Sequence, residues 1–222
     1  MAAASSAKRA LHIEVVSDIV CPWCYVGKKK LTEAVALAKG KHKELDISIG
    51  YNPYQLDSAM GHGLDKEEVY RNKFGDRAEQ MHQRVADVGK EVGIAFSFEG
   101  KMSNTLDAHR LVDYAKLHGG SYAEEKAVES LFHRYFEESQ DIGDTQVLLS
   151  VADDAGLDRE KAKQYLDSDE GIDTVKQKIK QVQRLGVTGV PFYIINDRYG
   201  VSGAETPETF LAAFEKVLAC QE

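Results

Sequence analysis

Cysteine, proline and tryptophan are scarce in this chain of 222 residues, with three, four and one copies respectively. An odd and low number of cysteines does not fit the disulfide framework of a small secreted domain, so a cysteine pair here points to redox chemistry or metal binding. The sequence has no apolar run near the roughly 20 residues of a membrane-spanning helix, and its start has no apolar segment of a secretory signal. We therefore expect a cytoplasmic protein without membrane contact, and the sequence leaves organellar targeting open.

Positive charge is also in short supply, because 28 lysines and arginines face 36 aspartates and glutamates, for a net charge of −8. A nucleic-acid-binding protein needs a basic surface to neutralise phosphates, so we expect no nucleic-acid partner. The one short basic run, Lys28 to Lys30, is interpreted as a solvated helix face. The hydrophobic fraction of 43% predicts a globular protein with a sizeable core.

The first part of the chain alternates between strand and helix patterns. Residues 11–20 are rich in β-branched side chains and predict a strand. Residues 45–51 alternate between apolar and polar side chains and predict a second strand, which ends at Asn52-Pro53. Residues 25–38 between them predict a helix. This order favours two parallel strands joined by a crossover helix.

The middle of the chain shows apolar residues at helical spacing and little strand signal. It predicts helices over residues 76–92, 105–118, 122–138 and 172–185, with Asp144 and Asp158 as N-caps of two more. The apolar stripes are interpreted as core packing.

The end of the chain returns to strand patterns, with a predicted hairpin over residues 191–203 and a final helix whose N-cap is Thr206. We therefore predict an α/β fold, in which a mixed sheet flanked by helices is interrupted by a large all-helical insertion. The predicted discontinuous sheet domain comprises residues 8–58 and 182–222, and the predicted inserted helical domain comprises residues 59–181.

The sequence Cys21-Pro22-Trp23-Cys24 lies between the first predicted strand and the first predicted helix. The N–H groups and dipole at a helix N-terminus favour an anion, so Cys21 is the candidate thiolate nucleophile. Cys24 follows one helical turn later and is the candidate resolving thiol, expected to be buried and less acidic. Pro22 and Trp23 are expected to tune the redox potential of the pair.

A zinc site and a packing coincidence fit this cysteine pair less well. A structural zinc site needs four ligands, and the sequence has neither a second pair of this spacing nor histidines at zinc-binding spacing, so we expect no metal. A packing coincidence of two small hydrophobic residues would not account for the strand–motif–helix context.

Val190-Pro191 begins the first strand of the predicted hairpin. Proline is tolerated at the first residue of a strand, and a cis peptide bond at this point is a specific device. It would present the Val190 backbone to an extended substrate close to the sulfurs, so Val190 and Pro191 are candidate substrate-binding residues.

With these motifs in hand, the sequence resembles the DsbA-like family of the thioredoxin superfamily, and most closely its FrnE-like branch. The resemblance covers residues 13–214, and Ser17-Asp18 followed by Cys21-Pro22-Trp23-Cys24 is its most specific motif. The other matching segments are Asn104-Thr105, Ala108-His109-Arg110, Leu131-Phe132, Tyr135-Phe136, residues 141–144, residues 187–191 and residues 202–204.

The resemblance implies a thioredoxin-like fold with a helical insertion, Cys21 as nucleophile, Cys24 as resolving thiol and Pro191 as the cis-proline. It also implies further candidates for the cleft or for proton transfer, which are Glu14, Asp18, Asn104, His109 and Arg110. Helix capping and surface pairing account for Asn104, His109 and Arg110 equally well. Asp18 also fits a loop residue that bonds its own backbone.

The favoured function is a thiol–disulfide oxidoreductase whose partners are protein or peptide thiols and disulfides, with no bound cofactor and with glutathione as an optional co-substrate. The first alternative is a glutathione-dependent enzyme like the kappa-type glutathione transferases and 2-hydroxychromene-2-carboxylate isomerases. Those relatives carry serine where this sequence has Cys21. The second alternative is a redox-sensing or chaperone-like binding module. The sequence leaves the direction of exchange and the oligomeric state open.

Overall fold

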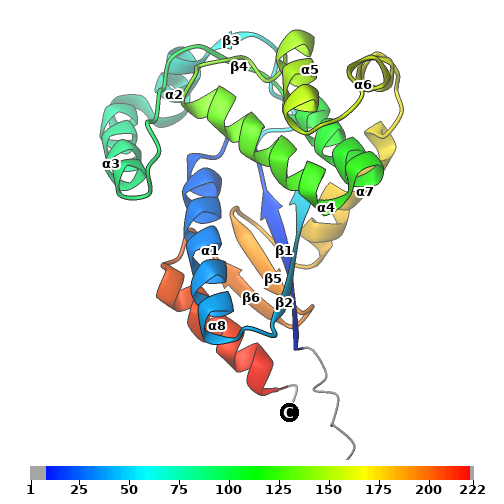
Figure 1. The fold of residues 1–222 in the computed structure, drawn as a ribbon. Coiled ribbons are helices and arrows are strands. Elements are labelled where there is room, and N and C mark those ends of the chain that lie inside the picture. Colours follow the sequence, from blue (N-terminus) through cyan, green and yellow to red (C-terminus); the bar gives the residue numbers. More distant parts are fainter. Residues whose placement is uncertain (1–8, 221–222) are drawn as a thin grey trace, which may run out of the picture.

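A four-stranded mixed sheet forms the base of the molecule in this computed structural model, which describes residues 9–220 (Figure 1). The strands are β1 (Ala10–Ser17), β2 (Asp46–Pro53), β5 (Phe192–Ile195) and β6 (Tyr199–Ser202). Their order across the sheet is β2-β1-β5-β6, with β1 and β2 parallel and the other neighbours antiparallel. The start of the chain, on which the prediction about export depends, lies outside the described residues.

Alternate residues of β1 point to opposite faces of the sheet, and both faces are covered. Ile13 and Val15 belong to the core shared with α1 (Pro22–Lys41) and α8 (Pro207–Ala219). Val16 faces the other way and packs with residues that include Val182 of α7 (Ile172–Arg184). The C-terminal half of the strand is therefore buried on both sides, and the apolar pair Val15-Val16 lies there, whereas His12 nearer the N-terminal end is exposed.

The chain between β2 and α7 forms a mainly helical layer above one end of the sheet (Figure 1). Its elements are β3 (Leu64–Asp65), α2 (Lys66–Phe74), the 3-10 turn η1 (Gly75–Arg77), α3 (Ala78–Glu91), β4 (Lys101–Met102), α4 (Leu106–Phe136), α5 (Thr145–Asp154) and α6 (Arg159–Leu166). Aromatic rings join this layer to α1, because Tyr25 stacks on Phe132 at 5.1 Å between ring centroids and packs against Phe136.

Most of the predicted elements are present, and the predicted α/β class with its mixed sheet and helical insertion is confirmed. Asp144, Asp158 and Thr206 cap their helices, each accepting a bond from a backbone N–H two or three residues ahead. The two helices predicted over residues 105–138 form one element, α4, with a break at Gly120, whose φ of 72° favours glycine.

The second strand includes the Asn52-Pro53 pair that was predicted to end it. Asn52-Pro53 does not end the strand early, because Pro53 is the last residue of β2 and pairs with Ser17. The next ladder bond comes from the Tyr54 N–H, so the missing proline N–H costs no bond there. The predicted division into domains stays a prediction, and its boundary at 181/182 falls inside α7.

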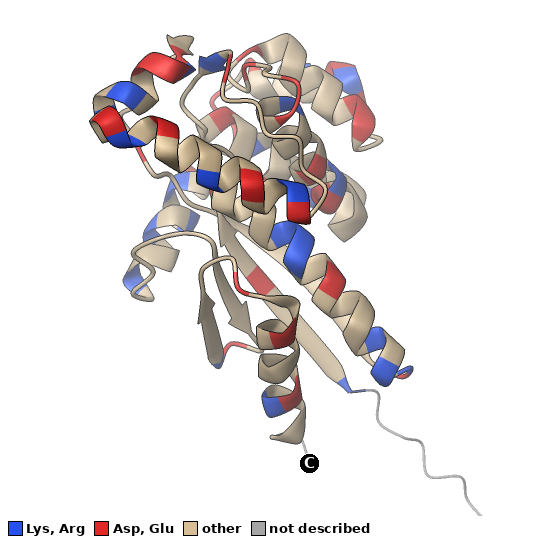
Figure 2. Cartoon of the chain, turned by 90° about the vertical axis from the view of Figure 1, so that its left-hand side faces the viewer, with Lys and Arg blue, Asp and Glu red and all other residues tan. Residues whose placement is uncertain are grey.

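Acidic and basic residues are interspersed along the helices, whereas the strands are mostly uncharged (Figure 2). Within residues 9–220, none of the helices has the length and apolarity needed to cross a bilayer.

Candidate active site

Cys21 lies at the N-cap of α1, at the end of the loop of residues 18–21 that we call the redox loop. Its extended backbone (φ −91°, ψ 111°) carries no side-chain cap, and Pro22 takes the first helical position, where a missing N–H is harmless. The Cys24 N–H bonds to the Cys21 carbonyl oxygen at 3.0 Å, so the second thiol follows one turn later. Both cysteines are buried and free, so the motif is present as a dithiol.

Cys24 is buried and has a raised pKa, which is the direction that the sequence led us to expect for it. Burial raises its pKa well above the ordinary value, and the neighbouring Cys21 raises it further, whereas the Asp18 backbone and the Ser17 hydroxyl lower it by less. The Ser17 hydroxyl faces this thiol, but it lacks the alignment of a full hydrogen bond. Cys24 is therefore a thiol that must lose its proton before it can attack.

Val190-Pro191 lies directly beside Cys21. The Val190–Pro191 peptide bond is cis, and the Cys21 thiol points at the Val190 carbonyl oxygen, 3.7 Å from Sγ. Gly27 of α1 makes this close approach feasible, because a Cβ there would lie 2.2 Å from Tyr193 Oη and 3.3 Å from Pro191 Cγ. We did not single out Gly27 from the sequence, and a glycine one turn after Cys24 was the available signal.

An apolar cavity of about 270 Å³ opens beside Cys21. Helices α2 and α3 contribute lining residues that include Val69 and Val85, and Trp23 and Val190 also line the cavity. Its other apolar lining residues are Val20, Leu56, Met60, Phe74, Met81, Phe98 and Met102. Three of the four methionines line this cavity, and flexible methionine side chains adapt to apolar groups of different shape.

Tyr70 and Trp23 are two aromatic residues that line this cavity. Burial raises the pKa of Tyr70, and the nearby Cys21 raises it further, so the phenol stays protonated and can donate a hydrogen bond. The Trp23 ring is half-buried and lies 5.7 Å from the Arg84 guanidinium. The Tyr70 phenol thus interacts with Cys21, and the Trp23 ring interacts with the Arg84 guanidinium.

Asp18, the first residue of the redox loop, and His109 are brought together by the fold, although 90 residues of sequence lie between them. Asp18 is 1% exposed, and its Oδ2 accepts a bond from the Leu56 N–H at 2.8 Å. His109 Nε2 lies 2.9 Å from the Tyr54 carbonyl oxygen and 3.4 Å from Asp18 Oδ1. This pair joins the insertion to the redox loop.

Asn104 orders the loop before α4. Its Oδ1 accepts a bond from the Leu106 N–H, and its Nδ2 donates to the Ser58 carbonyl oxygen. Asn104 therefore has a structural role at the start of α4, where Thr105 is the N-cap residue and Asn104 binds the N–H of the first helical residue.

Arg110 and Glu14 are not brought to the cysteines by the contacts of the described residues. The Arg110 guanidinium is buried and donates to the carbonyl oxygens of four residues around the end of α6, namely Tyr165, Leu166, Ser168 and Glu170. Glu14 bonds to His12 and Asn52 at 2.6 Å each. Both residues have structural partners, and the proposed proton-transfer role of Glu14 gains no support from its position.

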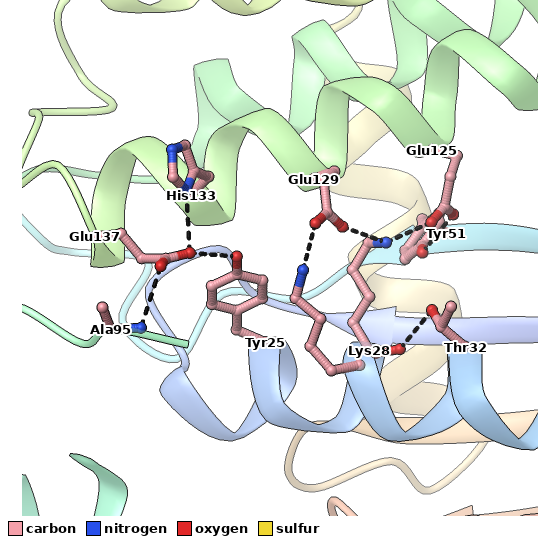
Figure 3. Close-up of polar contacts among 10 residues, drawn as sticks. Tyr25, Lys28, Thr32, Tyr51, Ala95, Glu125, Glu129, His133 and Glu137 are labelled. Carbon is pink, nitrogen blue, oxygen red and sulfur yellow. Dashed lines mark hydrogen bonds and ion pairs between the residues drawn. The ribbon is translucent and has the colours of Figure 1, made fainter. Parts of the chain in front are cut away.

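The structure corrects our interpretation of the basic run Lys28–Lys30 as a solvated helix face. Lys28 is buried and forms ion pairs with Glu125 and Glu129 of α4 (Figure 3). Burial alone lowers the pKa of Lys28, but the two carboxylates raise it more, so the net shift is upward. Lys28 and Lys29 are therefore part of the contact between α1 and the insertion, whereas Lys30 donates to the Ala204 carbonyl oxygen.

Tyr25 and Glu137 extend this contact toward the redox motif. The Tyr25 hydroxyl donates to Glu137 Oε1 at 2.6 Å, and the other Glu137 oxygen accepts from the Ala95 N–H (Figure 3). We call the contacts of Tyr25, Lys28 and Lys29 with Glu125, Glu129 and Glu137 the polar seam. It fixes α1 against α4 over several turns.

Residues 9–220 contain no group of three or more His, Cys, Asp or Glu side chains that could hold a metal ion. The groups that meet at Cys21 are the dithiol, the backbone at Val190-Pro191 and the apolar cavity.

The chain belongs to the family described as the DSBA-like thioredoxin domain, which matches residues 12–215. A Streptomyces coelicolor protein described as a probable DsbA oxidoreductase is similar in sequence and structure. It has 28% identity and a TM-score of 0.83, and the match covers 93% of this chain and 89% of that one.

Two more distant structures share the fold. A 2-hydroxychromene-2-carboxylate isomerase is 15% identical with a TM-score of 0.69, covering 93% of this chain and 95% of that chain. The cytosolic disulfide reductase DsbM from Pseudomonas aeruginosa, in a structure with GSH, is 17% identical with a TM-score of 0.62, covering 94% of this chain and 99% of that chain. At these identities the likeness extends to the fold alone.

Proposed function

We propose that this chain is a thiol–disulfide oxidoreductase that acts on protein or peptide disulfides and dithiols through Cys21 and Cys24. The observation that carries the proposal is Cys21 itself, a free thiol at the N-cap of α1 whose Sγ lies 3.7 Å from the Val190 carbonyl oxygen. A nucleophile, helix N–H groups that favour its thiolate, and a backbone suited to an extended substrate thus meet at one point.

In the reducing direction, the Cys21 thiolate attacks one sulfur of a substrate disulfide, and the other substrate sulfur leaves as a thiolate. Cys24 then loses its proton and attacks Cys21 Sγ in the mixed disulfide. The bond between Cys21 and the substrate breaks, the second substrate thiolate leaves, and the chain holds the Cys21–Cys24 disulfide. Two electrons pass from the dithiol to the substrate, and the reverse sequence oxidises a substrate dithiol.

The apolar cavity supports a polypeptide substrate more than glutathione alone. Glutathione carries two carboxylates and an ammonium group, whereas Lys73 and His82 are the only basic side chains among the described lining residues. An apolar side chain next to the substrate cysteine would instead be removed from water, at roughly 25 cal/mol per Å² of buried area. Val190 and Pro191 would hold the backbone on the other side of the sulfur.

A glutathione-dependent transferase or isomerase is the second candidate function. The observation that favours it is a cavity beside Cys21 in a fold shared with the isomerase and with DsbM, whose structure contains GSH. Conjugation of glutathione to an electrophile does not need a resolving thiol. Activity that survives Cys24→Ser unchanged would therefore favour this candidate over disulfide exchange.

We also propose a cytoplasmic location and membership of the FrnE-like branch. In a cytosol poised at about −220 to −320 mV, an oxidising couple rests reduced. Reduction, isomerisation or redox sensing then fits this chain better than net oxidation.

Trapping a mixed disulfide tests the proposed function. In a Cys24→Ser variant, the adduct between Cys21 and a peptide with one disulfide should accumulate, and mass spectrometry should locate it on Cys21. Cys220 is exposed, so the experiment is done in a Cys220→Ser background. Cys21→Ser is the matched control and should form no adduct. Absence of an adduct at Cys21 would contradict the proposal.

A further inference from the structure

Two buried oxygen atoms at the junction of β1 and the redox loop, Ser17 Oγ and Asp18 Oδ1, have no hydrogen-bond partner among the described residues. Their residues are 5% and 1% exposed. Buried polar atoms are nearly always bonded, so two such exceptions in adjacent residues require an explanation. Both residues are neighbours of His109, which belongs to the insertion.

The hydrogen bond of His109 defines which ring nitrogen is basic. The Tyr54 carbonyl oxygen, 2.9 Å from Nε2, can only accept a hydrogen bond, so Nε2 carries the proton of the neutral ring. Nδ1 is then the nitrogen that can accept a further proton. Asp18 Oδ1, 3.4 Å from Nε2, is placed to stabilise the resulting imidazolium.

Ser17 and His109 line the same small pocket, which has a volume of about 10 Å³. That volume is at the lower limit for holding one water molecule. Asp113 and Tyr51 also line it, and the Asp113 carboxylate is paired with Lys178 of α7 at 2.5 Å. The titratable groups around His109 are therefore Asp18 from the redox loop, Tyr51 from β2 and the paired Asp113 from α4.

The Ser17 hydroxyl also faces Cys24, the thiol that must lose a proton during resolution. Cys24 is 3% exposed, so bulk water has poor access to it. Ser17 can give its own proton toward the cavity while it accepts the proton of Cys24, because a hydroxyl is both donor and acceptor.

We propose that Ser17, His109 and Asp18 form a proton relay that deprotonates Cys24 when it attacks the mixed disulfide. The inference rests on the proposed function. The Cys24 proton passes to Ser17 Oγ, and the Ser17 proton passes through cavity water to His109 Nδ1. The sulfur electron pair of Cys24 forms the bond to Cys21 Sγ, and the electron pair of the broken bond leaves on the substrate thiolate. In the reverse reaction, the His109 imidazolium returns the proton to Cys24.

An aromatic disulfide reagent that releases a coloured thiolate tests the relay in a Cys220→Ser background. The attack of Cys21 on the reagent releases the first thiolate, and resolution by Cys24 releases the second. The two steps are followed in one stopped-flow trace. His109→Gln keeps an N–H donor for the Tyr54 carbonyl oxygen but has no basic nitrogen. His133→Gln, at an exposed position of the same helix, is the matched control.

We expect His109→Gln to leave the first release unchanged and to slow the second by about tenfold or more at neutral pH, as loss of a general base does. The second release should recover toward the wild-type rate as pH rises, because hydroxide then removes the Cys24 proton. Ser17→Ala should slow the second release as well, and Ser17→Thr should restore it. If His109→Gln does not fold, the comparison of Ser17→Ala with Ser17→Thr tests the relay instead.

The relay is wrong if resolution is unchanged in both His109→Gln and Ser17→Ala. It is also wrong if both releases slow equally, since that result indicates a distorted redox loop. If the wild-type protein shows no second release at all, the proposed function itself fails, which is a different result from an unchanged variant.

Discussion

Helix α1 meets the insertion in two chemically different ways. Along its length, the polar seam joins Tyr25, Lys28 and Lys29 to carboxylates of α4 (Figure 3). At its N-terminus, Cys21 and Trp23 instead border the apolar cavity walled by α2 and α3. Ion pairs and charged hydrogen bonds fix geometry, whereas apolar contacts tolerate different shapes. The comparison suggests that the seam holds the nucleophile in place while the cavity accepts varied substrates.

Two buried lysines, Lys28 and Lys66, also differ in how their positive charge is compensated. Lys28 is paired with two carboxylates, and its pKa is raised despite burial. Lys66, at the start of α2, is fully buried and donates to the Tyr135 carbonyl oxygen at 2.9 Å, with its Nζ 3.8 Å from the centroid of the Tyr135 ring. Burial lowers its pKa to about 8, because carbonyl oxygens and a ring compensate a cation less well than carboxylates do.

The largest expected effect lies on the cavity side. Cys21→Ser should abolish disulfide exchange, because serine is a poor nucleophile toward sulfur, with a loss of at least about a thousandfold in turnover. Turnover of a fluorescent peptide disulfide measures it. Cys220→Ser is the control and should retain full activity, and exchange that persists without Cys21 would contradict the assignment of the nucleophile.

Breaking the polar seam should reduce stability and leave the chemistry of the dithiol intact. Lys28→Met removes the buried cation shared by Glu125 and Glu129, but both carboxylates are partly exposed, and Glu129 keeps Lys29 as a partner. We therefore expect the free energy of unfolding to fall by roughly 2 kcal/mol. Denaturant unfolding measures the change, with Lys126→Met at an exposed position of α4 as the control.

The same variant, Lys28→Met, should also raise the pKa of Glu129. Burial alone would raise the Glu129 pKa, but Lys28 and, to a smaller extent, Lys29 lower it more, to about 2. The stabilisation is present above the ordinary pKa of 4.5 and is lost as pH falls toward about 2. Lys28→Met should weaken this acid sensitivity, and an unaltered acid-unfolding profile would argue against the seam.

Lys66 sharpens the comparison at high pH. Its folded-state pKa of about 8 lies below the ordinary 10.5, so between these values the unfolded chain binds more protons and stability rises with pH. Relative to Lys66→Met, we expect the wild type to gain roughly 2 kcal/mol in the free energy of unfolding between about pH 7.5 and about pH 9.5. Paired denaturant titrations at the two ends of this range measure the gain. A constant difference between the two proteins would contradict the pKa direction.

The smallest expected effect concerns substrate choice. Val69→Trp should fill part of the apolar cavity and raise KM about fivefold for a peptide with a large apolar residue beside its cysteine, a cost near 1 kcal/mol. The kcat value and the reaction with glutathione disulfide should change little. Leu37→Trp, at an exposed position of α1, is the control. Equal effects on both substrates would indicate that the cavity does not select the substrate.

Much of the sheet domain could be predicted because its signals are local. The β-branched run before Cys21, the N-terminal position of Pro22 and the capping by Thr206 each depend on neighbouring residues. Helix α2 was missed because its sequence, Lys66 to Phe74, is mostly charged and has few apolar positions to show a period.

The cavity and the seam could not be predicted because tertiary contacts build them. The cavity gathers Met60, Met81 and Met102 from three separate segments, each of which looks like ordinary core. Lys28 resembles a surface residue until α4 brings two carboxylates to it. His109 was named from a motif, but its neighbours Asp18 and Ser17 depend on how the insertion folds back onto β1.

The central claim is that Cys21 and Cys24 form a working dithiol–disulfide couple, and a redox titration tests it most directly. Trp23 is the only tryptophan of the chain and lies between the two cysteines, so its fluorescence reports the couple. In glutathione or dithiothreitol buffers, we predict a reversible two-electron transition that is absent from the Cys21→Ser/Cys24→Ser variant. No transition, with both thiols slow to alkylate at neutral pH, would contradict the claim.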